Sequence, residues 1–188
     1  MLDRIDRDNT DITAVDAQIE VLLDPFGDAV ARLEEIPGID PKAAAVIAEI
    51  GIDMTRFPSP GHLASWTKFA PGIKASAGKS KGNGSTGHGN RYLARATGEA
   101  AVSAGRTETF LGARYRRIAR RRGKKKAMVA VGRSILTITW HLLADPDTRF
   151  HDLGPDHYDK RVSTTAKRRS HVRGLEALGY NVTLQPVA

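Results

Sequence analysis

The chain has 188 residues and a formal net charge of +8, with 29 Lys and Arg against 21 Asp and Glu. It contains no cysteine, which excludes disulfides and thiolate metal sites and fits a cytoplasmic location. No apolar run is long enough to span a membrane, and the charged N-terminus is unlike a secretory signal. The basic excess favours a polyanionic partner, because phosphate contacts release counterions. A basic protein without a specific partner is the alternative.

Residues 2–23 are predicted to form a helix with an apolar residue at every seventh position. This seam continues past the helix and consists of Ile5, Ile12, Ile19, Phe26 and Leu33. Such a repeat is typical of a coiled-coil-like helix, here one that pairs with a second copy to give a homo-oligomer. Packing of this helix on its own domain is the alternative. Pro25 is expected to interrupt and restart the helix.

Residues 33–51 read as a helix-hairpin-helix. A helix ends, residues 37–40 turn the chain, and Pro41 opens a second helix with Asp40 as its cap. The amides of such a hairpin can hold a DNA phosphate, and Gly38 and Lys42 are the predicted contacts. A hairpin that serves only packing is the alternative.

A short helix is expected over about 60–69, capped by Ser59. Leu63, Trp66 and Phe69 are predicted to form its core face, with Trp66 in the core rather than stacked on a base.

Residues 71–90 contain six glycines and three lysines, too glycine-rich a composition for a helix or a packed core. A long loop inside a compact domain is usually functional, although a flexible linker is possible. Ser76 is the favoured nucleophile here, while Ser80 and Ser85 have similar surroundings. The predicted nucleic-acid contacts of the loop are Lys74, Lys79, Lys81 and His88.

Asn90 is predicted to cap a helix that runs to about Ala104. Arg91 and Arg95 lie in its first turns, where the helix dipole disfavours cations. A bound phosphate would offset this unfavourable interaction, so the two arginines favour an anion site.

A further helix is expected over 107–122, and the most apolar helix, over 127–143, is predicted to be central to the core. Nine of the thirteen residues from Arg114 to Lys126 are basic, and their mutual repulsion favours a bound polyanion over a merely solvated face. The predicted contacts are Arg114, Arg116, Arg117, Arg120, Arg121 and Lys124.

Turn residues dominate the chain after residue 145. Its histidines and aspartates match no metal motif, so no metal site is predicted. A helix over about 165–178 should end at Gly179, and residues 180–185 alternate like a short strand. The expected fold is a mainly α helical bundle in three parts: a coiled-coil helix (1–28), a domain with the hairpin and the serine loop (29–145), and a tail with one helix (146–188).

Other catalytic motifs are missing from the sequence. It contains neither a Gly-x-x-x-x-Gly-Lys-Ser/Thr phosphate loop nor a Gly-x-Ser-x-Gly elbow, and its carboxylates are scattered. If the chain cuts DNA, the nucleophile is therefore expected to be a side chain.

Several ordered motifs resemble the C-terminal transposase domain of the IS110 insertion-sequence family, which also includes IS116 and IS902. They are IPGID, AEIG, DMTRFPSPGHLASW, APG, SAGK, GHGNRYL, GEAA and TFLGARYRRIARRRGKKKAMVAVGRSIL. The resemblance implies an oligomeric DNA transposase guided by a structured RNA, with its catalytic serine at Ser76. Two positions depart from the family: His88 replaces a basic residue, and Ala94 replaces the arginine of a Leu-Arg pair.

The family also has an N-terminal RuvC-like domain with acidic metal ligands, followed by a coiled coil. This sequence starts within the region that resembles the coiled coil. We therefore expect no cofactor in this chain itself, with Mg²⁺ bound only when the acidic domain is supplied, and no autonomous transposition. The alternative is a non-catalytic nucleic-acid-binding fragment.

Overall fold

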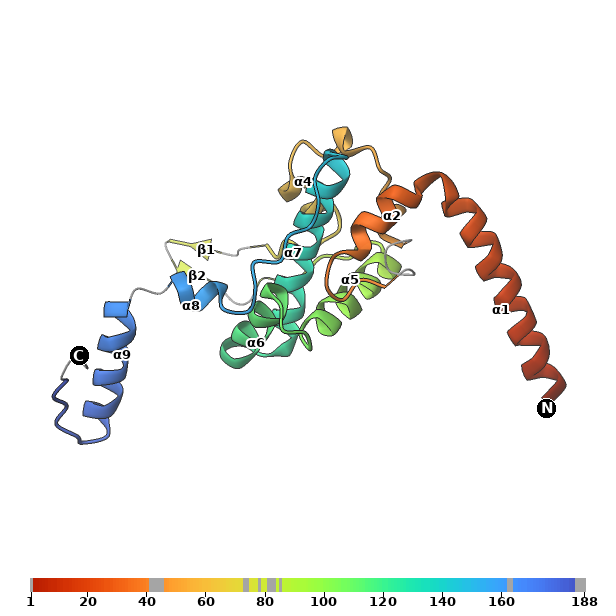
Figure 1. The fold of residues 1–188 in the computed structure, drawn as a ribbon. Coiled ribbons are helices and arrows are strands. Elements are labelled where there is room, and N and C mark those ends of the chain that lie inside the picture. The colour runs from red at the N-terminus through yellow and green to blue at the C-terminus, as the bar shows by residue number, and fades with distance from the viewer. Residues whose placement is uncertain are drawn as a thin grey trace.

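The computed structural model describes residues 2–40, 46–72, 75–77, 79–80, 84, 86–161 and 164–184, with the backbone alone for 75, 76, 80, 159, 161 and 164–167. The fold is mainly α, as predicted (Figure 1). In chain order the elements are α1 (Leu2–Leu23), η1 (Asp24–Phe26), α2 (Gly27–Glu34), η2 (Met54–Arg56), α4 (Pro60–Trp66), β1 (Ala75–Ser76), β2 (Lys79–Ser80), α5 (Arg91–Ala104), α6 (Phe110–Arg122), α7 (Lys124–Ala144), α8 (His157–Arg161) and α9 (Thr164–Ala177).

Helix α7 is the centre of the domain and packs against α2, α4, α5 and α6 (Figure 1). Its buried residues recur every three or four positions: Ala127, Val131, Gly132, Ile135, Leu136, Thr139, Leu142 and Leu143. Each buried Val, Leu or Ile stabilises the fold by about 1.5–3 kcal/mol relative to an exposed one. Among the described helices, α7 alone is long and apolar enough to cross a membrane, but 44% of that stretch is buried within the domain.

Close approach of other elements to α7 requires small residues. A β-carbon on Gly132 would lie 2.5 Å from the ring of Phe69, and one on Gly98 of α5 would lie 3.3 Å from the sulfur of Met128. Since packed interiors leave little spare volume, these glycines set how closely α5 and the segment after α4 approach α7.

The helices α6 and α7 follow each other with only Gly123 between them. Gly123 has φ 87° and ψ 159°, which breaks the helical path. Helix α6 begins at Phe110, later than expected, because the Thr109 hydroxyl accepts a hydrogen bond from the Gly112 amide (3.2 Å) and caps it. Helix α7 begins at Lys124, so part of the basic run is helical on both sides of the break.

Arg32 joins α2 to the C-terminal end of α7. Its guanidinium is buried and donates to the carbonyl oxygens of Leu142 (2.5 Å) and Asp145 (3.1 Å). Nearby, the Glu35 carboxylate accepts hydrogen bonds from Arg149 (2.8 Å) and from the Phe150 amide (2.9 Å). A cation at the end of a helix satisfies carbonyls that have no partner within the helix.

Helix α1 extends away from the rest of the domain and has no buried residue (Figure 1). The exposed fractions of Ile5, Ile12 and Ile19 are 48%, 57% and 41%, whereas Leu33, at the end of the same seam, is fully buried. The alternative that this helix packs on its own domain is therefore wrong for residues 2–23. The interruption predicted at Pro25 is confirmed as the turn η1.

The predicted helix after Ser59 ends earlier than expected, and one of its predicted core residues is wrong. Leu63 and Phe69 are buried, but Trp66 is 47% exposed. The helix stops at Trp66, and Lys68 adopts φ 65°, so the chain reverses and brings Phe69 into the core. Ser59 lies at the cap position, but its hydroxyl bonds to the His62 ring (2.8 Å) and not to a backbone amide.

The predicted C-terminal strand is also wrong. Residues 180–184 are not a strand, and residue 185 lies outside the described residues. The Tyr180 amide instead donates to the Leu175 carbonyl (3.1 Å), which completes the end of α9 beside Gly179 with its φ of 89°. Alternation alone was misleading because a strand needs a partner strand to satisfy its backbone groups.

Candidate nucleic-acid interface

The glycine-rich loop contains an antiparallel ribbon that its composition does not predict. Strands β1 and β2 pair Ser76 with Lys79 and Ala75 with Ser80. Ala77, at the turn between them, has φ 51°. A left-handed conformation at a residue other than glycine is uncommon, and such residues concentrate at functional sites. The ribbon therefore holds Ser76 at a tight, strained turn.

The loop returns along the end of α4. A β-carbon on Gly84 would overlap the carbonyl of Gly72, and one on Gly89 would lie 2.9 Å from the Lys68 side chain. The two ends of the loop thus approach each other closely at Gly72 and Gly84, and Gly89 packs on Lys68 after α4. A flexible linker does not require such contacts.

The predicted site residues of the loop are placed only in part. Lys79 and His88 are exposed. The side chain of Ser76 lies outside what the structure describes, as do Lys42 of the hairpin, Lys74 and Lys81.

The start of α5 is capped as predicted. The Asn90 side-chain oxygen accepts hydrogen bonds from the amides of Tyr92 (2.9 Å) and Leu93 (3.1 Å). The exposed Arg91 guanidinium lies 4.9 Å from the centre of the Tyr92 ring and donates to the Tyr92 hydroxyl (2.9 Å). This arrangement presents a cation and an aromatic ring together at a helix N-terminus, where anions are favoured.

Arg95, one turn later, is partly neutralised. It forms an ion pair with Glu99 at 2.8 Å, and this hydrogen bond raises the pKa of Arg95. Both side chains are largely exposed, so the pair adds little stability. Of the two predicted arginines, Arg91 is the one whose charge has no carboxylate beside it in the described part of the chain.

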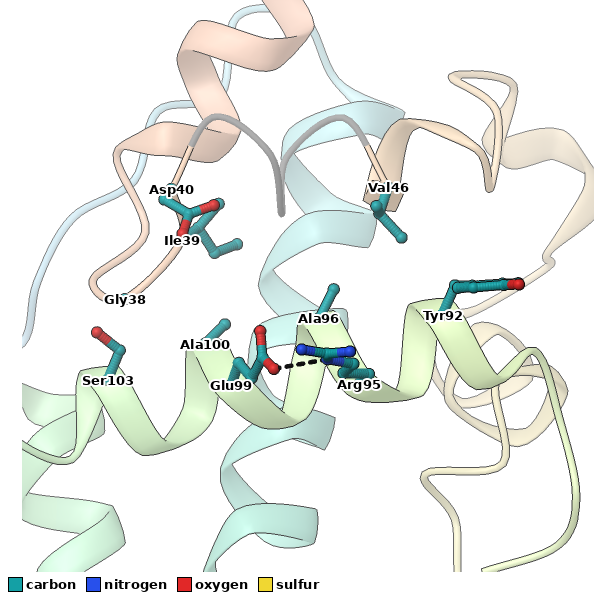
Figure 2. A pocket seen from close by; sticks show the side chains of 10 residues that line it. All are labelled: Gly38, Ile39, Asp40, Val46, Tyr92, Arg95, Ala96, Glu99, Ala100 and Ser103. Carbon is teal, nitrogen blue, oxygen red and sulfur yellow. Dashed lines mark hydrogen bonds and ion pairs between the residues drawn. The ribbon is translucent and has the colours of Figure 1, made fainter. Parts of the chain in front are cut away.

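A groove of about 620 Å³ lies between the turn after α2 and one face of α5. Figure 2 shows the residues that line it. Gly38 and Ile39 line one side, and Arg95, Glu99 and Ser103 the other. Gly38 has φ 91°, and a β-carbon there would lie 2.6 Å from the Ala104 amide nitrogen. This contact favours the packing interpretation of the hairpin turn, and nucleic-acid contact by Gly38 stays a prediction.

The basic run on α6 divides into side chains with protein partners and side chains without. Arg116 is bound to its own N-terminal loop: it donates to the carbonyl of Thr107 (2.9 Å) and pairs with Glu108 (3.0 Å). Arg114 donates to the Tyr158 hydroxyl (2.9 Å), and the Arg117 guanidinium lies 4.6 Å from the centre of the Tyr158 ring.

Within the part of the chain that the structure describes, five exposed cations of this run have no hydrogen bond or ion pair. They are Arg120, Arg121, Arg122, Lys124 and Lys125. Their charges are therefore available to a polyanion, unlike that of Arg116.

Three residues of this region were missed as site residues. Phe110 and Tyr158 stack with ring centres 5.3 Å apart, and the Asp152 carboxylate accepts from the Phe110 amide (3.0 Å). Asp152 thus accepts a hydrogen bond at the start of a helix 42 residues away in the sequence. Such separation leaves no local pattern that could have identified this role.

Comparisons with known proteins agree with the motifs. Residues 30–116 match the family model described as "Transposase IS116/IS110/IS902 family". The chain is also 32% identical over 136 residues to a Streptomyces coelicolor protein called "Insertion element IS110 uncharacterized 43.6 kDa protein". The match covers 70% of this chain and 33% of the relative, so the chain spans about a third of that relative's length. The chain therefore carries the C-terminal transposase domain of the IS116/IS110/IS902 family.

Proposed function

We propose that this chain acts in DNA transposition, where it binds DNA and supplies Ser76 as the nucleophile for strand cleavage and exchange. The observation that carries the proposal is the match of residues 30–116, a range that includes the Ser76–Lys79 motif, to a transposase family. The strained turn at Ala77, directly beside Ser76, supports it.

The proposed step is attack by the Ser76 hydroxyl oxygen on the phosphorus of a DNA phosphodiester. The oxygen–phosphorus bond forms, and the bond from phosphorus to the leaving nucleoside oxygen breaks. The serine proton passes to a base, for which His88 is the candidate, and the leaving oxygen takes a proton from water. Negative charge builds on the phosphoryl oxygens, and Lys79, whose backbone pairs with that of Ser76, is the candidate to stabilise it.

The family resemblance also implies Mg²⁺. A Mg²⁺ site needs oxygen ligands gathered at one place. Among the described residues, no three His, Asp or Glu side chains are grouped closely enough to hold an ion. The described residues of this chain therefore do not fit the metal.

DNA binding is attributed to the exposed cations at the C-terminal end of α6 and the start of α7, together with Arg91 at the start of α5. Each cation that contacts a phosphate releases a counterion, so binding should weaken steeply with salt. A structured guide RNA presents the same phosphate chemistry and is the second proposed partner.

The nucleophile is tested by trapping a covalent adduct. The chain is incubated with labelled DNA, guide RNA, Mg²⁺ and a RuvC-like acidic domain supplied as a separate protein, and adducts that survive denaturation are resolved on a gel. We expect an adduct with the wild-type chain and with Ser80→Ala, and none with Ser76→Ala. An adduct that persists in Ser76→Ala would remove Ser76 as the nucleophile.

A second candidate function is nucleic-acid binding without catalysis. The five exposed cations around Gly123 that have no ion pair among the described residues favour this function, because they can bind phosphates without any catalytic step. This function predicts salt-sensitive binding that Ser76→Ala leaves unchanged, and no adduct under any condition. Unchanged affinity after replacement of Arg120, Arg121, Arg122 and Lys124 by Gln would exclude this surface.

We also propose that α1 pairs with α1 of a second copy. Ile5, Ile12 and Ile19 are 41–57% exposed at heptad spacing, which leaves an apolar seam without a partner in the single chain. Light scattering should give a dimer mass for the wild-type chain and a monomer mass for the double variant Ile5→Asp/Ile12→Asp. A monomer in both would contradict the pairing.

A further inference from the structure

The tail of the chain returns to α6 and covers part of its basic face. The Asp152 carboxylate accepts from the Phe110 amide at the start of α6 (3.0 Å) and from the Gly154 amide (3.1 Å). The Phe110 ring then stacks on Tyr158 and meets the edge of His157, with ring centres 5.3 and 5.0 Å apart. These contacts hold α8 against α6.

Tyr158 and α6 together form a small pocket of about 210 Å³. Arg114, Arg117, Ile118, Arg121 and Arg122 of α6 line it, with Tyr158 as the side chain from the tail. None of these lining residues is acidic. Four arginines line this small pocket, so their positive charges repel one another, and a bound anion would replace that repulsion with attraction.

The hydrogen-bonding groups of the pocket complement an anion. The arginine side chains that line it carry hydrogen-bond donors and no acceptor. The Tyr158 hydroxyl accepts from Arg114 (2.9 Å), so its own proton remains free to be donated. The pocket therefore offers donors from both the arginines and the tyrosine.

Arg117 is held in place by the tail. Its guanidinium lies 4.6 Å from the centre of the Tyr158 ring, so the tyrosine both orients Arg117 and supplies a donor. Arg116, on the same helix, is excluded from the pocket because it pairs with Glu108 and the loop before α6.

We propose that this pocket binds one phosphate group of a nucleic acid, and that Tyr158 makes the tail part of the binding surface. The inference rests on the proposed nucleic-acid binding by α6 and specifies how one phosphate is held. The phosphate belongs either to an internal phosphodiester or to a strand end, since both present the same oxygens.

The test is fluorescence anisotropy of a labelled DNA duplex, titrated with the full chain over a series of KCl concentrations in phosphate-free buffer. Tyr158→Phe keeps the ring and the net charge and loses only the hydroxyl. We expect it to weaken binding on the order of tenfold without changing the salt slope. Arg121→Gln should weaken binding and reduce the slope of log K against log[KCl] by about 0.9.

Arg133→Gln is the matched control, because it removes one exposed charge from α7 outside the pocket. We expect it to change affinity less than Arg121→Gln. Equal losses in the two arginine variants, or wild-type affinity of Tyr158→Phe, would overturn the pocket. Failure of the wild-type chain to bind DNA would instead overturn the proposed nucleic-acid binding together with the pocket.

Duplexes with 5′-phosphate and 5′-hydroxyl ends distinguish the two sources of the phosphate. Weaker binding of Tyr158→Phe to both duplexes assigns an internal phosphate. Weaker binding only to the duplex with 5′-phosphate assigns a strand end.

Discussion

Gly38, in the turn after α2, lies directly against the backbone of Ala104 at the end of α5. A β-carbon on Gly38 would lie 2.6 Å from the Ala104 amide nitrogen and would overlap the carbonyl of Ala100. Gly38 also has φ 91°. The turn after α2 is thus packed on α5 through Gly38. A glycine is needed there both for the close backbone contact and for the positive φ.

Gly38→Ala should destabilise the domain by more than the roughly 1–2 kcal/mol of a left-handed residue alone, because the methyl group also meets backbone atoms that cannot move aside. Urea denaturation measures the loss. Gly154→Ala is the control, since Gly154 has φ 79° but no described atom within 4 Å of the added carbon. Equal losses in the two variants would show that α5 does not approach Gly38 as closely as described.

Arg32→Met should cost about 1.5–3 kcal/mol of stability, because it removes charged hydrogen bonds to the Leu142 and Asp145 carbonyls at the end of α7. The methionine keeps most of the apolar stem. Arg133→Met, on the exposed face of α7, should change the free energy of unfolding by less than about 0.5 kcal/mol. A comparable loss in both variants would argue against the role of Arg32.

Asn90→Ala should destabilise the domain by about 1 kcal/mol, because the amides of Tyr92 and Leu93 lose their acceptor. Asn90→Asp keeps an acceptor and should retain stability. Thermal unfolding followed by circular dichroism distinguishes the two variants. Equal melting temperatures for Asn90→Ala and the wild-type chain would contradict the cap.

Asp145 should contribute a pH dependence to stability. The Thr148 hydroxyl, followed by the Asp147 amide, lowers the pKa of Asp145, and Arg32 contributes in the same direction. A carboxyl whose pKa is lower in the folded state stabilises the fold above its unfolded pKa, about 3.9. That stability is lost as the pH falls through the folded value.

Thr148→Val removes the largest of these contributions, so the variant should lose less stability than the wild-type chain on acidification below about pH 4. Urea midpoints measured from neutral to acidic pH give the comparison. Thr137→Val, whose hydroxyl bonds to the Arg133 carbonyl within α7, is the control and should follow the wild-type profile. Parallel profiles for Thr148→Val and the wild-type chain would contradict the assignment.

The sequence by itself determined the features that depend on neighbouring residues. The helix over 2–23, the Asn90 cap, the apolar core helix and the end of α9 at Gly179 all follow from periodicity and capping within a few positions. The transposase domain was identified in the same way, from ordered motifs that are each continuous in the chain.

Only the tertiary structure decided which members of the basic run are free and what surrounds them. Arg116 and Arg117 are adjacent in sequence, yet one is tied to Glu108 and the other lies over Tyr158, 41 positions further along the chain (158 − 117). Trp66 was misplaced because the reversal at Lys68 exposes it. The contact of Arg32 with Leu142 spans 110 positions. Contacts over such separations form only when whole helices pack, and no local propensity records them.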